Sequence, residues 1–526
     1  MLTKISEPQQ IDYVELSNPQ ALLRTLQNLR QAVYEEGEII LNQWQSQLKR
    51  PDFRHSAQNL AYYLSLRRRD LRPLQTALMP WGLSSLGRIE ARVMPNLDAV
   101  IATLTAICQP NTASLPKRPP LEAFFEGTRL LQKHTEALFG KNSTQRQVRI
   151  LVTLPTDATN NYEFVRDLLN RGADCVRINC AHDNTEKWEA MIANVRRAEQ
   201  ETGKSCKVLM DLSGPKPRTG NIIEPSDGKR VLEGDYILLK HAKANKKSDK
   251  KSTQIKQDNT GLSGKSFQTS CTIPEILDQL KIGAVVWIDD GKIGTQVVDT
   301  NYRLTAESTP GVLLRVTHAP PKGAKLRPDK GLNFPDTVLQ LSPLTEKDYQ
   351  DLDFVATHAD IIGYSFVQQA ADIALLQQAL ETRIKDLQIP AIVAKIETPE
   401  AVRNLPELIV QAAGKQSFGV MIARGDLAVE IGYQRMVEMQ EEILWLCEAA
   451  HVPVIWATQV LESLVKEGTP SRGEMTDAAM AERAECVMLN KGPFVAEAVT
   501  ILDDVLTRMQ AHQKKKTPQL RALHSW

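Results

Sequence analysis

The stretch 391–400, "AIVAKIETPE", poses the question of the fold, because an apolar run carries two charges. The apolar residues are typical of a buried strand, yet Lys395 and Glu397 stand two positions apart within it. Side chains two apart on a strand point to the same face. Two charges in an apolar core cost several kcal/mol unless they are paired or bind an ion. We therefore expect this strand to end at a site where both charges have partners.

Seven further apolar runs have the length of strands, and most are followed by an amphipathic stretch that is long enough for a helix. They span residues 148–154, 175–179, 207–212, 359–366, 418–426, 453–459 and 486–490. Continuous apolar strands that alternate with helices predict a parallel sheet buried on both faces. With 391–397 they make eight β–α units, which favour a (β/α)8 TIM barrel, an α/β fold, over an open sheet.

Two regions do not follow this alternation. Residues 221–329 contain strand-like segments with turns between them and no clear helix, which predicts an all-β domain inserted after strand 3. Residues 1–120 predict an N-terminal helical domain that ends in a Pro-rich linker. The barrel is then expected in two parts, 121–220 and 330–526. The helical domain is either a regulatory or partner-binding module or a bundle that packs on the barrel.

Composition narrows the class of protein. The chain has 526 residues and a formal net charge of +1, so no overall field recruits nucleic acid or an anionic membrane. No apolar run approaches the 18 or so residues of a spanning helix, and no secretory signal is evident. The seven cysteines include no C-x-x-C pair, which predicts free thiols in a reducing cytoplasm.

Polar residues gather where the predicted strands end, which is the end of a TIM barrel that carries active sites. They are Arg177, Asn179, His182, Asp211, Ser365, Lys395, Glu397, Arg424, Asp426, Thr458, Gln459 and Asn490. Glu397 and Asp426 could share Mg²⁺ or Mn²⁺, and Lys395 and Arg177 could hold a phosphate. The pattern predicts metal-assisted chemistry on a phosphorylated or carboxylated small molecule, in which Thr458 positions a water or relays a proton.

The stretch 259–266, "NTGLSGKS", is close to a nucleotide-binding phosphate loop, but Asn259 replaces the first glycine. That motif needs a strand before it and a helix after it, and neither is predicted here. A turn is the favoured interpretation.

Across roughly residues 146–510 the sequence resembles the pyruvate kinase family. The motifs that carry the resemblance are "CVRINCAHD", "DLSGPKPRTG", "IDDGKIG", "DKGLNFP", "LTEKDYQDLDF", "VAKIETPEAVRN", "MIARGDLAVEI", "VIWATQVLESL" and "PSRGEMTDAAMA". The resemblance implies a barrel and a lid domain that closes over the substrates. It also implies an enzyme that converts phosphoenolpyruvate and ADP, or another nucleoside diphosphate, into pyruvate and ATP.

The resemblance also implies roles for individual residues. Lys395 would stabilise the transferring phosphoryl group, Arg177 would contact that phosphate, and Thr458 would lie near the enolate carbon that is protonated. Glu397 and Asp426 would ligate the Mg²⁺ (or Mn²⁺).

Further binding roles follow from the same resemblance. Backbone amides of Arg424, Gly425 and Asp426, with Thr458 nearby, would bind the substrate carboxylate. Asn179, His182 and Arg218 match positions on the nucleotide side.

Departures from the family pattern bear on the cations. The family's monovalent-cation site uses Asn, Ser, Asp and Thr, whereas this chain has Asn179, Ala181, Asp211 and Leu212 there. Lys216 stands where potassium-dependent relatives have Glu. Its ammonium can supply the missing charge, so K⁺ is predicted to be unnecessary.

Departures on the nucleotide side leave other functions open. The stretches "NKGPF" (490–494) and "TLPTDAT" (153–159) replace longer or different family loops. The family's C-terminal regulatory domain has no counterpart, so control through it is not expected; a homo-oligomer remains possible. One alternative is a catalytically altered relative that acts as a phosphoenolpyruvate-binding or regulatory protein. Another is an aldolase-type enzyme, although Lys395 favours phosphoryl transfer.

Overall fold

Eight parallel strands close into a barrel, in the order β1-β14-β13-β12-β11-β10-β3-β2. The computed structural model describes residues 18–84, 86–109, 117–142, 146–225, 228–241, 264–304, 308–384 and 389–519. The barrel strands are β1 (Arg149–Thr153), β2 (Cys175–Asn179), β3 (Lys207–Asp211), β10 (Ile361–Tyr364), β11 (Ala391–Ile396), β12 (Phe418–Ala423), β13 (Val454–Ala457) and β14 (Cys486–Leu489). The predicted TIM barrel is therefore confirmed, with strands at all eight predicted apolar runs.

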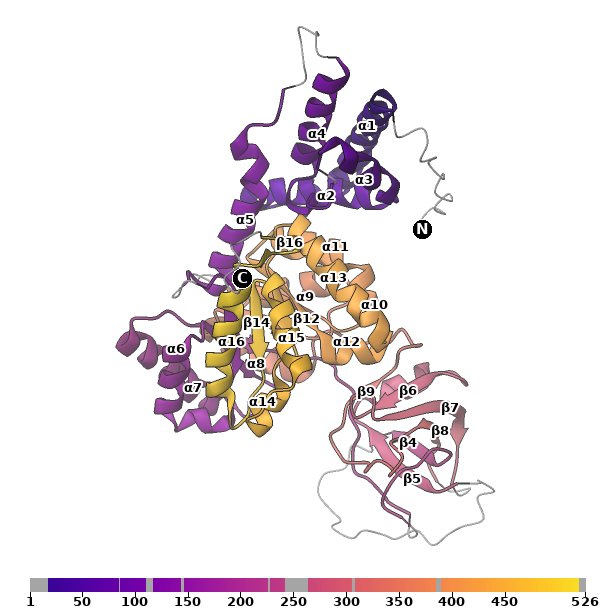
Figure 1. Cartoon of the computed structure of the whole chain (residues 1–526). Helices are drawn as coiled ribbons and strands as arrows, with labels where there is room; N and C mark the ends of the chain where they lie inside the picture. The colour runs from indigo at the N-terminus through magenta and orange to yellow at the C-terminus, as the bar shows by residue number, and fades with distance from the viewer. Residues whose placement is uncertain are drawn as a thin grey trace.

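Helices surround the barrel (Figure 1). They are α6 (Tyr162–Arg171), α7 (Thr185–Thr202), α8 (Glu346–His358), α9 (Ala370–Glu381), α10 (Pro399–Arg403), α11 (Leu405–Ala413), α12 (Arg424–Ile431), α13 (Tyr433–Ala449), α14 (Glu462–Glu467), α15 (Arg472–Met480) and α16 (Val495–Met509). Side-chain caps begin several of them: Thr345 and Asp348 form a reciprocal capping box at α8. After α16 the chain ends its described part in a small hairpin, β15 (Gln513–Lys514) and β16 (Thr517–Pro518).

The barrel interior is plugged at the end where the strands begin. Helix α5 (Leu121–Phe139) leads into β1, and its last residues, Leu138 and Phe139, belong to the interior cluster with Val393 and Met421. A Cβ on Gly419 would lie 2.5 Å from the Leu138 side chain, so glycine leaves the room that this plug needs. The interior is therefore packed at this end, and the open mouth lies at the carboxyl ends of the strands.

The insertion between β3 and β10 is a six-stranded sheet in the order β5-β4-β8-β7-β6-β9. Its strands are β4 (Tyr236–His241), β5 (Ser266–Cys271), β6 (Val285–Ile288), β7 (Ile293–Tyr302), β8 (Gly311–His318) and β9 (Leu332–Asn333). One short 3-10 helix, η6 (Pro274–Gln279), interrupts the predicted all-β pattern. Strand β5 begins at Ser266, where a phosphate loop would need a helix; most of 259–266 lies outside the described residues.

The N-terminal region is helical, as predicted, and packs at the plugged end of the barrel, away from the β insertion (Figure 1). It comprises α1 (Pro19–Trp44), α2 (Arg54–Arg67), α3 (Arg72–Leu78) and α4 (Val93–Cys108), with short 3-10 turns η2 (Pro51–Phe53), η3 (Met79–Trp81) and η4 (Glu90–Arg92). Asn59 on α2 donates to the carbonyls of Glu90 and Ala449, at 2.7 and 2.8 Å. The apolar side chains of the N-terminal region share one continuous core with the helices around the barrel.

Helix α4 is the apolar element of this region. Within the described residues, the segment Glu90–Cys108 is the one helical stretch that is long and apolar enough to cross a membrane, by length and composition. More than half of that window is buried inside the protein, as is usual for a core helix. The seven cysteines are free thiols, and all but Cys108 are buried, in agreement with the prediction.

Candidate active site

Lys395, near the end of β11, lies at the centre of the barrel mouth. Its Nζ is 2.7 Å from Ser365 Oγ, 3.1 Å from Glu397 Oε1 and 3.3 Å from Asp211 Oδ2. Arg177 on β2 contacts the same Asp211 oxygen through its Nε at 2.9 Å. The two charges of "AIVAKIETPE" therefore have partners, in a network that joins four strand ends.

The charges in this network support one another. Burial alone would raise the pKa of Asp211, but the charges of Lys395 and Arg177 outweigh burial and lower it. Burial would lower the pKa of Lys395, and Asp211 and Glu397 raise it instead. Both side chains are thus held in their charged forms at neutral pH.

The pKa of Glu397 is shifted toward the neutral form, unlike that of Asp211. It is 2% exposed, and burial raises the pKa of its carboxyl group, with the negative charge of Asp426 adding to the effect. The amide of Phe366 donates to Glu397 Oε2 at 2.7 Å. Phe366 adopts a φ of 56°, an uncommon backbone conformation outside glycine that lies in the loop contacting this carboxylate.

Asp426, in the first turn of α12, faces a second lysine. Lys216 Nζ lies 2.6 Å from Asp426 Oδ1, and its charge also acts on Glu397. Lys216 follows β3 in the segment that leads to the β insertion. Lys216 thus lies beside the carboxylate pair predicted to bind the metal. Asp211, which was predicted to share a cation site with Lys216, contacts Arg177 and Lys395 instead.

Thr458 follows β13 with a φ of 65°. Its Oγ1 accepts a hydrogen bond from the Gly425 amide at 2.8 Å and donates to the Ala457 carbonyl at 2.7 Å. The predicted carboxylate-binding amides and Thr458 therefore lie together at the start of α12. The Arg424 side chain points elsewhere, because its Nη2 contacts Asp477 Oδ2 on α15 at 2.8 Å.

A separate cavity of about 260 Å³ lies beside this network, and the predicted nucleotide residues Asn179 and His182 line it together with Arg177. Burial, with the charges of Lys491 and Arg218, lowers the pKa of His182, so the ring is neutral at pH 7. Arg218 donates to the Asp329 carbonyl at 3.0 Å. It does not line the cavity, although its charge reaches His182.

Some residues of the mouth and of the nucleotide-side cavity were not predicted to have a role. Ser365 was predicted at a strand end, but its contact with Lys395 was not. Glu462 and Lys466 on α14 also line the nucleotide-side cavity, and Glu462 lies 3.3 Å from Asn490 Nδ2. The quoted motif "VIWATQVLESL" contains Glu462, but nothing in its spacing indicated a direction toward β2.

Two carboxylates suit a divalent cation that keeps open positions. Within the described residues, no three Asp, Glu, His or Cys side chains form a metal-binding group. Mg²⁺ characteristically uses one or two carboxylates and takes its remaining ligands from water and phosphate oxygens, so Glu397 and Asp426 fit that ion. Each Glu397 oxygen has one donor in the structure and a lone pair free for a ligand.

The protein is thus an α/β TIM barrel whose mouth pairs a buried lysine and arginine with carboxylates. The pyruvate kinase barrel domain, as a family model, matches residues 145–499, so the chain belongs to the pyruvate kinase family.

Individual relatives of the chain support the same family assignment. The chain is 31% identical to a pyruvate kinase of Dictyostelium discoideum over 368 residues, which are 68% of this chain and 66% of that protein. It is 31% identical to a pyruvate kinase of Methylorubrum extorquens over 372 residues, 69% of each. For a pyruvate kinase of Geobacillus stearothermophilus the identity is 30% over 373 residues, 70% of this chain and 57% of that protein. The chain thus spans about two thirds or less of several relatives' length.

A solved structure resembles the fold as well. A pyruvate kinase from Cryptosporidium parvum matches with a TM-score of 0.57 and 26% sequence identity over 72% of both chains. The matched share of this chain is similar to that of the sequence relatives.

Proposed function

We propose that this chain is a pyruvate kinase that transfers the phosphoryl group of phosphoenolpyruvate to ADP or another nucleoside diphosphate. The observation that carries the proposal is the position of Lys395, held at the mouth by Asp211, Ser365 and Glu397 with Arg177 alongside. Family membership supports it. Two fixed cations that face a carboxylate pair suit a phosphoryl group that passes between anionic reactants.

The side chains would act mainly by positioning and by charge. Lys395 would stabilise the negative charge of the transferring phosphoryl group, and Arg177 would bind its oxygens; both are already oriented by Asp211. The amides of Arg424 and Asp426 at the start of α12 would bind the substrate carboxylate, and the Gly425 amide would join them only by leaving Thr458 Oγ1, to which it donates in the structure. Thr458, fixed by Gly425 and Ala457, would hold or relay the proton that the enolate carbon accepts.

We propose Glu397 and Asp426 as the ligands of Mg²⁺ or Mn²⁺. The metal would supply Lewis-acid stabilisation of the phosphate and enolate oxygens. Lys216, now 2.6 Å from Asp426 Oδ1, would have to share this carboxylate with the ion.

We also propose that turnover needs no K⁺. Lys216 places a permanent ammonium beside Glu397 and Asp426, and the altered residues Ala181 and Leu212 remove two side-chain oxygens from the degenerate site formed by Asn179 and Asp211. The nucleotide would enter beside Asn179 and His182, with Arg218 at the edge of the insertion.

The remaining expectations concern the setting of the enzyme. We propose that residues 221–329 form the lid, that 121–220 and 330–526 form the barrel, and that 1–120 pack on its base. We also propose that the protein works in the cytoplasm on small molecules, without nucleic acid or membrane partners.

A coupled assay for pyruvate tests the function. With Mg²⁺ and no K⁺, we expect pyruvate to form only when a nucleoside diphosphate is present. Pyruvate without any nucleotide would contradict phosphoryl transfer. Tight phosphoenolpyruvate binding without turnover would instead indicate the regulatory relative.

A further inference from the structure

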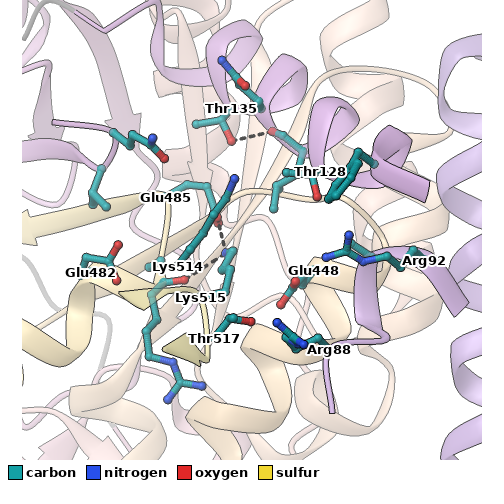
Figure 2. A pocket seen from close by; sticks show the side chains of 18 of the residues that line it. Arg88, Arg92, Thr128, Thr135, Glu448, Glu482, Glu485, Lys514, Lys515 and Thr517 are labelled. Carbon is teal, nitrogen blue, oxygen red and sulfur yellow. Dashed lines mark hydrogen bonds and ion pairs between the residues drawn. The ribbon is translucent and has the colours of Figure 1, made fainter. Parts of the chain in front are cut away.

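A second and larger cavity, of about 550 Å³, is lined by residues where barrel strands begin and therefore lies at the base of the barrel, opposite the mouth. Figure 2 shows this cavity from close by. Six parts of the chain line it: residues 84–96 around η4 and the start of α4, helix α5 with Asn142 after it, residues 147–149 at the start of β1, the end of α13, residues 482–485 just before β14, and the β15–β16 hairpin with Gln519. Its volume lies in the range of small-molecule sites. None of the residues assigned to catalysis or nucleotide binding lines it.

Buried polar atoms at this cavity lack partners within the protein. Arg149 and Asn96 are each 4% exposed and line the cavity. Within the described residues, the lining atoms without a hydrogen-bond partner are Arg92 Nε, Asn96 Oδ1, Arg149 Nε, Arg483 Nε and Glu482 Oε2. Buried polar groups are nearly always satisfied, so such a cluster indicates a missing partner such as a ligand or water.

The charge of the lining favours an anion. Six lysine and arginine side chains and four glutamates line the cavity. Lys515 is paired with Glu485 and Arg483 with Glu441, whereas Arg88, Arg92 and Lys514 form no ion pair among the described residues. Arginine forks and lysine bind phosphate oxygens well, and the unpaired cations leave this role open.

One wall of the cavity is aromatic. Phe124 and Phe125 on α5 line it, with ring centroids 5.2 Å apart. The Arg92 guanidinium lies 4.8 Å from the Phe124 centroid, so the cationic and apolar parts adjoin. We infer that this cavity, the base pocket, binds an organic phosphate monoester, with an apolar or aromatic body against Phe124 and Phe125 and its phosphate on Arg88, Arg92 and Lys514.

Glu448 is one of the four lining glutamates whose charge opposes this assignment, and it supplies a test. It points into the base pocket near Arg88 and Arg92 (Figure 2). Burial raises the pKa of Glu448 to about 7, so its charge is already disfavoured there. At about pH 8, above that pKa, the carboxylate is mostly charged, and removing it should strengthen the binding of an anion.

Calorimetric titration of the full chain with phenyl phosphate tests the inference, with inorganic phosphate and phenol as separate probes. We expect saturable binding of phenyl phosphate, and weaker binding of each half molecule. The double variant Arg88→Gln/Lys514→Gln changes two exposed side chains and should weaken binding at least about tenfold. Arg24→Gln changes an exposed side chain of α1 outside the pocket; it is the matched control and should leave the affinity unchanged.

Other outcomes would overturn the base pocket. They are the absence of binding by all three probes, equal affinity in the double variant, and an effect of Arg24→Gln as large as that of the double variant. At about pH 8, where Glu448 is mostly charged, Glu448→Gln should tighten binding, and unchanged or weaker binding at that pH would also overturn it. Loss of binding in Lys395→Met but not in the double variant would place the probe at the mouth. The inference does not depend on turnover at the mouth.

Discussion

Replacing Lys395 by Met tests the centre of the mouth, because Met keeps most of the side-chain volume and removes only the charge. The ammonium now lies between Asp211 and Glu397, which are 1% and 2% exposed. After the change Asp211 keeps Arg177, whereas Glu397 keeps only the Phe366 amide. Removing the Lys395 charge should therefore lower both the stability of the folded protein and the rate of turnover.

The two effects have different sizes. Breaking a buried ion pair costs about 3–5 kcal/mol of unfolding free energy. We expect about 3 kcal/mol here, because Arg177 still neutralises Asp211 and Glu397 can take up a proton. For turnover, losing a charge contact to the transition state costs roughly 3–4 kcal/mol, which is a loss of about 10²- to 10³-fold in kcat.

Both effects are measurable on one preparation. The coupled pyruvate assay at saturating substrates gives kcat, and urea unfolding gives the free energy of unfolding. Lys207→Met is the matched control: Lys207 begins a barrel strand at the plugged end and pairs with Asp360 at 3.2 Å. It should cost under about 1 kcal/mol and leave kcat unchanged. A Lys395→Met enzyme within tenfold of the wild-type kcat, or an equal loss in Lys207→Met, would refute the role of Lys395.

Three further predictions follow from single contacts. Lys216→Gln should lower kcat/KM at least about tenfold without K⁺, because the ammonium beside Asp426 is lost. Measuring kcat/KM over a KCl titration tests this. The role is wrong if the wild type needs K⁺ and the kcat/KM of the variant equals that of the wild type. Burial raises the pKa of Glu430 to about 7, so the folded state keeps a proton that the unfolded chain releases above about pH 4.5. Stability should then fall by the order of 2–3 kcal/mol between pH 4.5 and 7, and a Glu430→Gln variant with an equally steep urea-unfolding profile would contradict this. Gly127→Ala should destabilise the protein by about 1–3 kcal/mol, because a Cβ there would overlap the backbone of η4, whereas exposed Gly473→Ala in α15 should not; equal melting temperatures would disprove the close packing.

The barrel could be predicted because each of its strands has a sequence pattern that can be recognised within a few consecutive residues. A strand buried on both faces must be continuously apolar, so each of the eight runs identifies itself without its neighbours. The carboxyl-end rule then places Arg177, Lys395 and Glu397 at one mouth, and the structure brings them together around Asp211. Polar residues at the ends of apolar runs were the needed signal.

Contacts between distant segments could not be predicted in the same way. Lys216 and Asp426 are 210 positions apart, and their approach depends on the path of the chain from β3 into the insertion. The side chain of Arg424 reaches Asp477 rather than the mouth because α12 begins at Arg424 itself. The base pocket combines six segments, none of which carries a recognisable motif.

The contact between Lys216 and Asp426 explains how the mouth can hold so much charge. Arg177, Lys395 and Lys216 contribute three positive charges, and Asp211, Glu397 and Asp426 contribute three negative ones. A divalent cation and a phosphorylated carboxylic acid, which carries about three negative charges, would then change the total by only about one unit. Without Lys216 the empty mouth would carry a net negative charge that opposes an anionic substrate, unless a free cation entered. In the proposed K⁺-independent mechanism, the lysine would provide within the chain the charge that a bound monovalent ion would otherwise supply, without the entropy cost of capturing one.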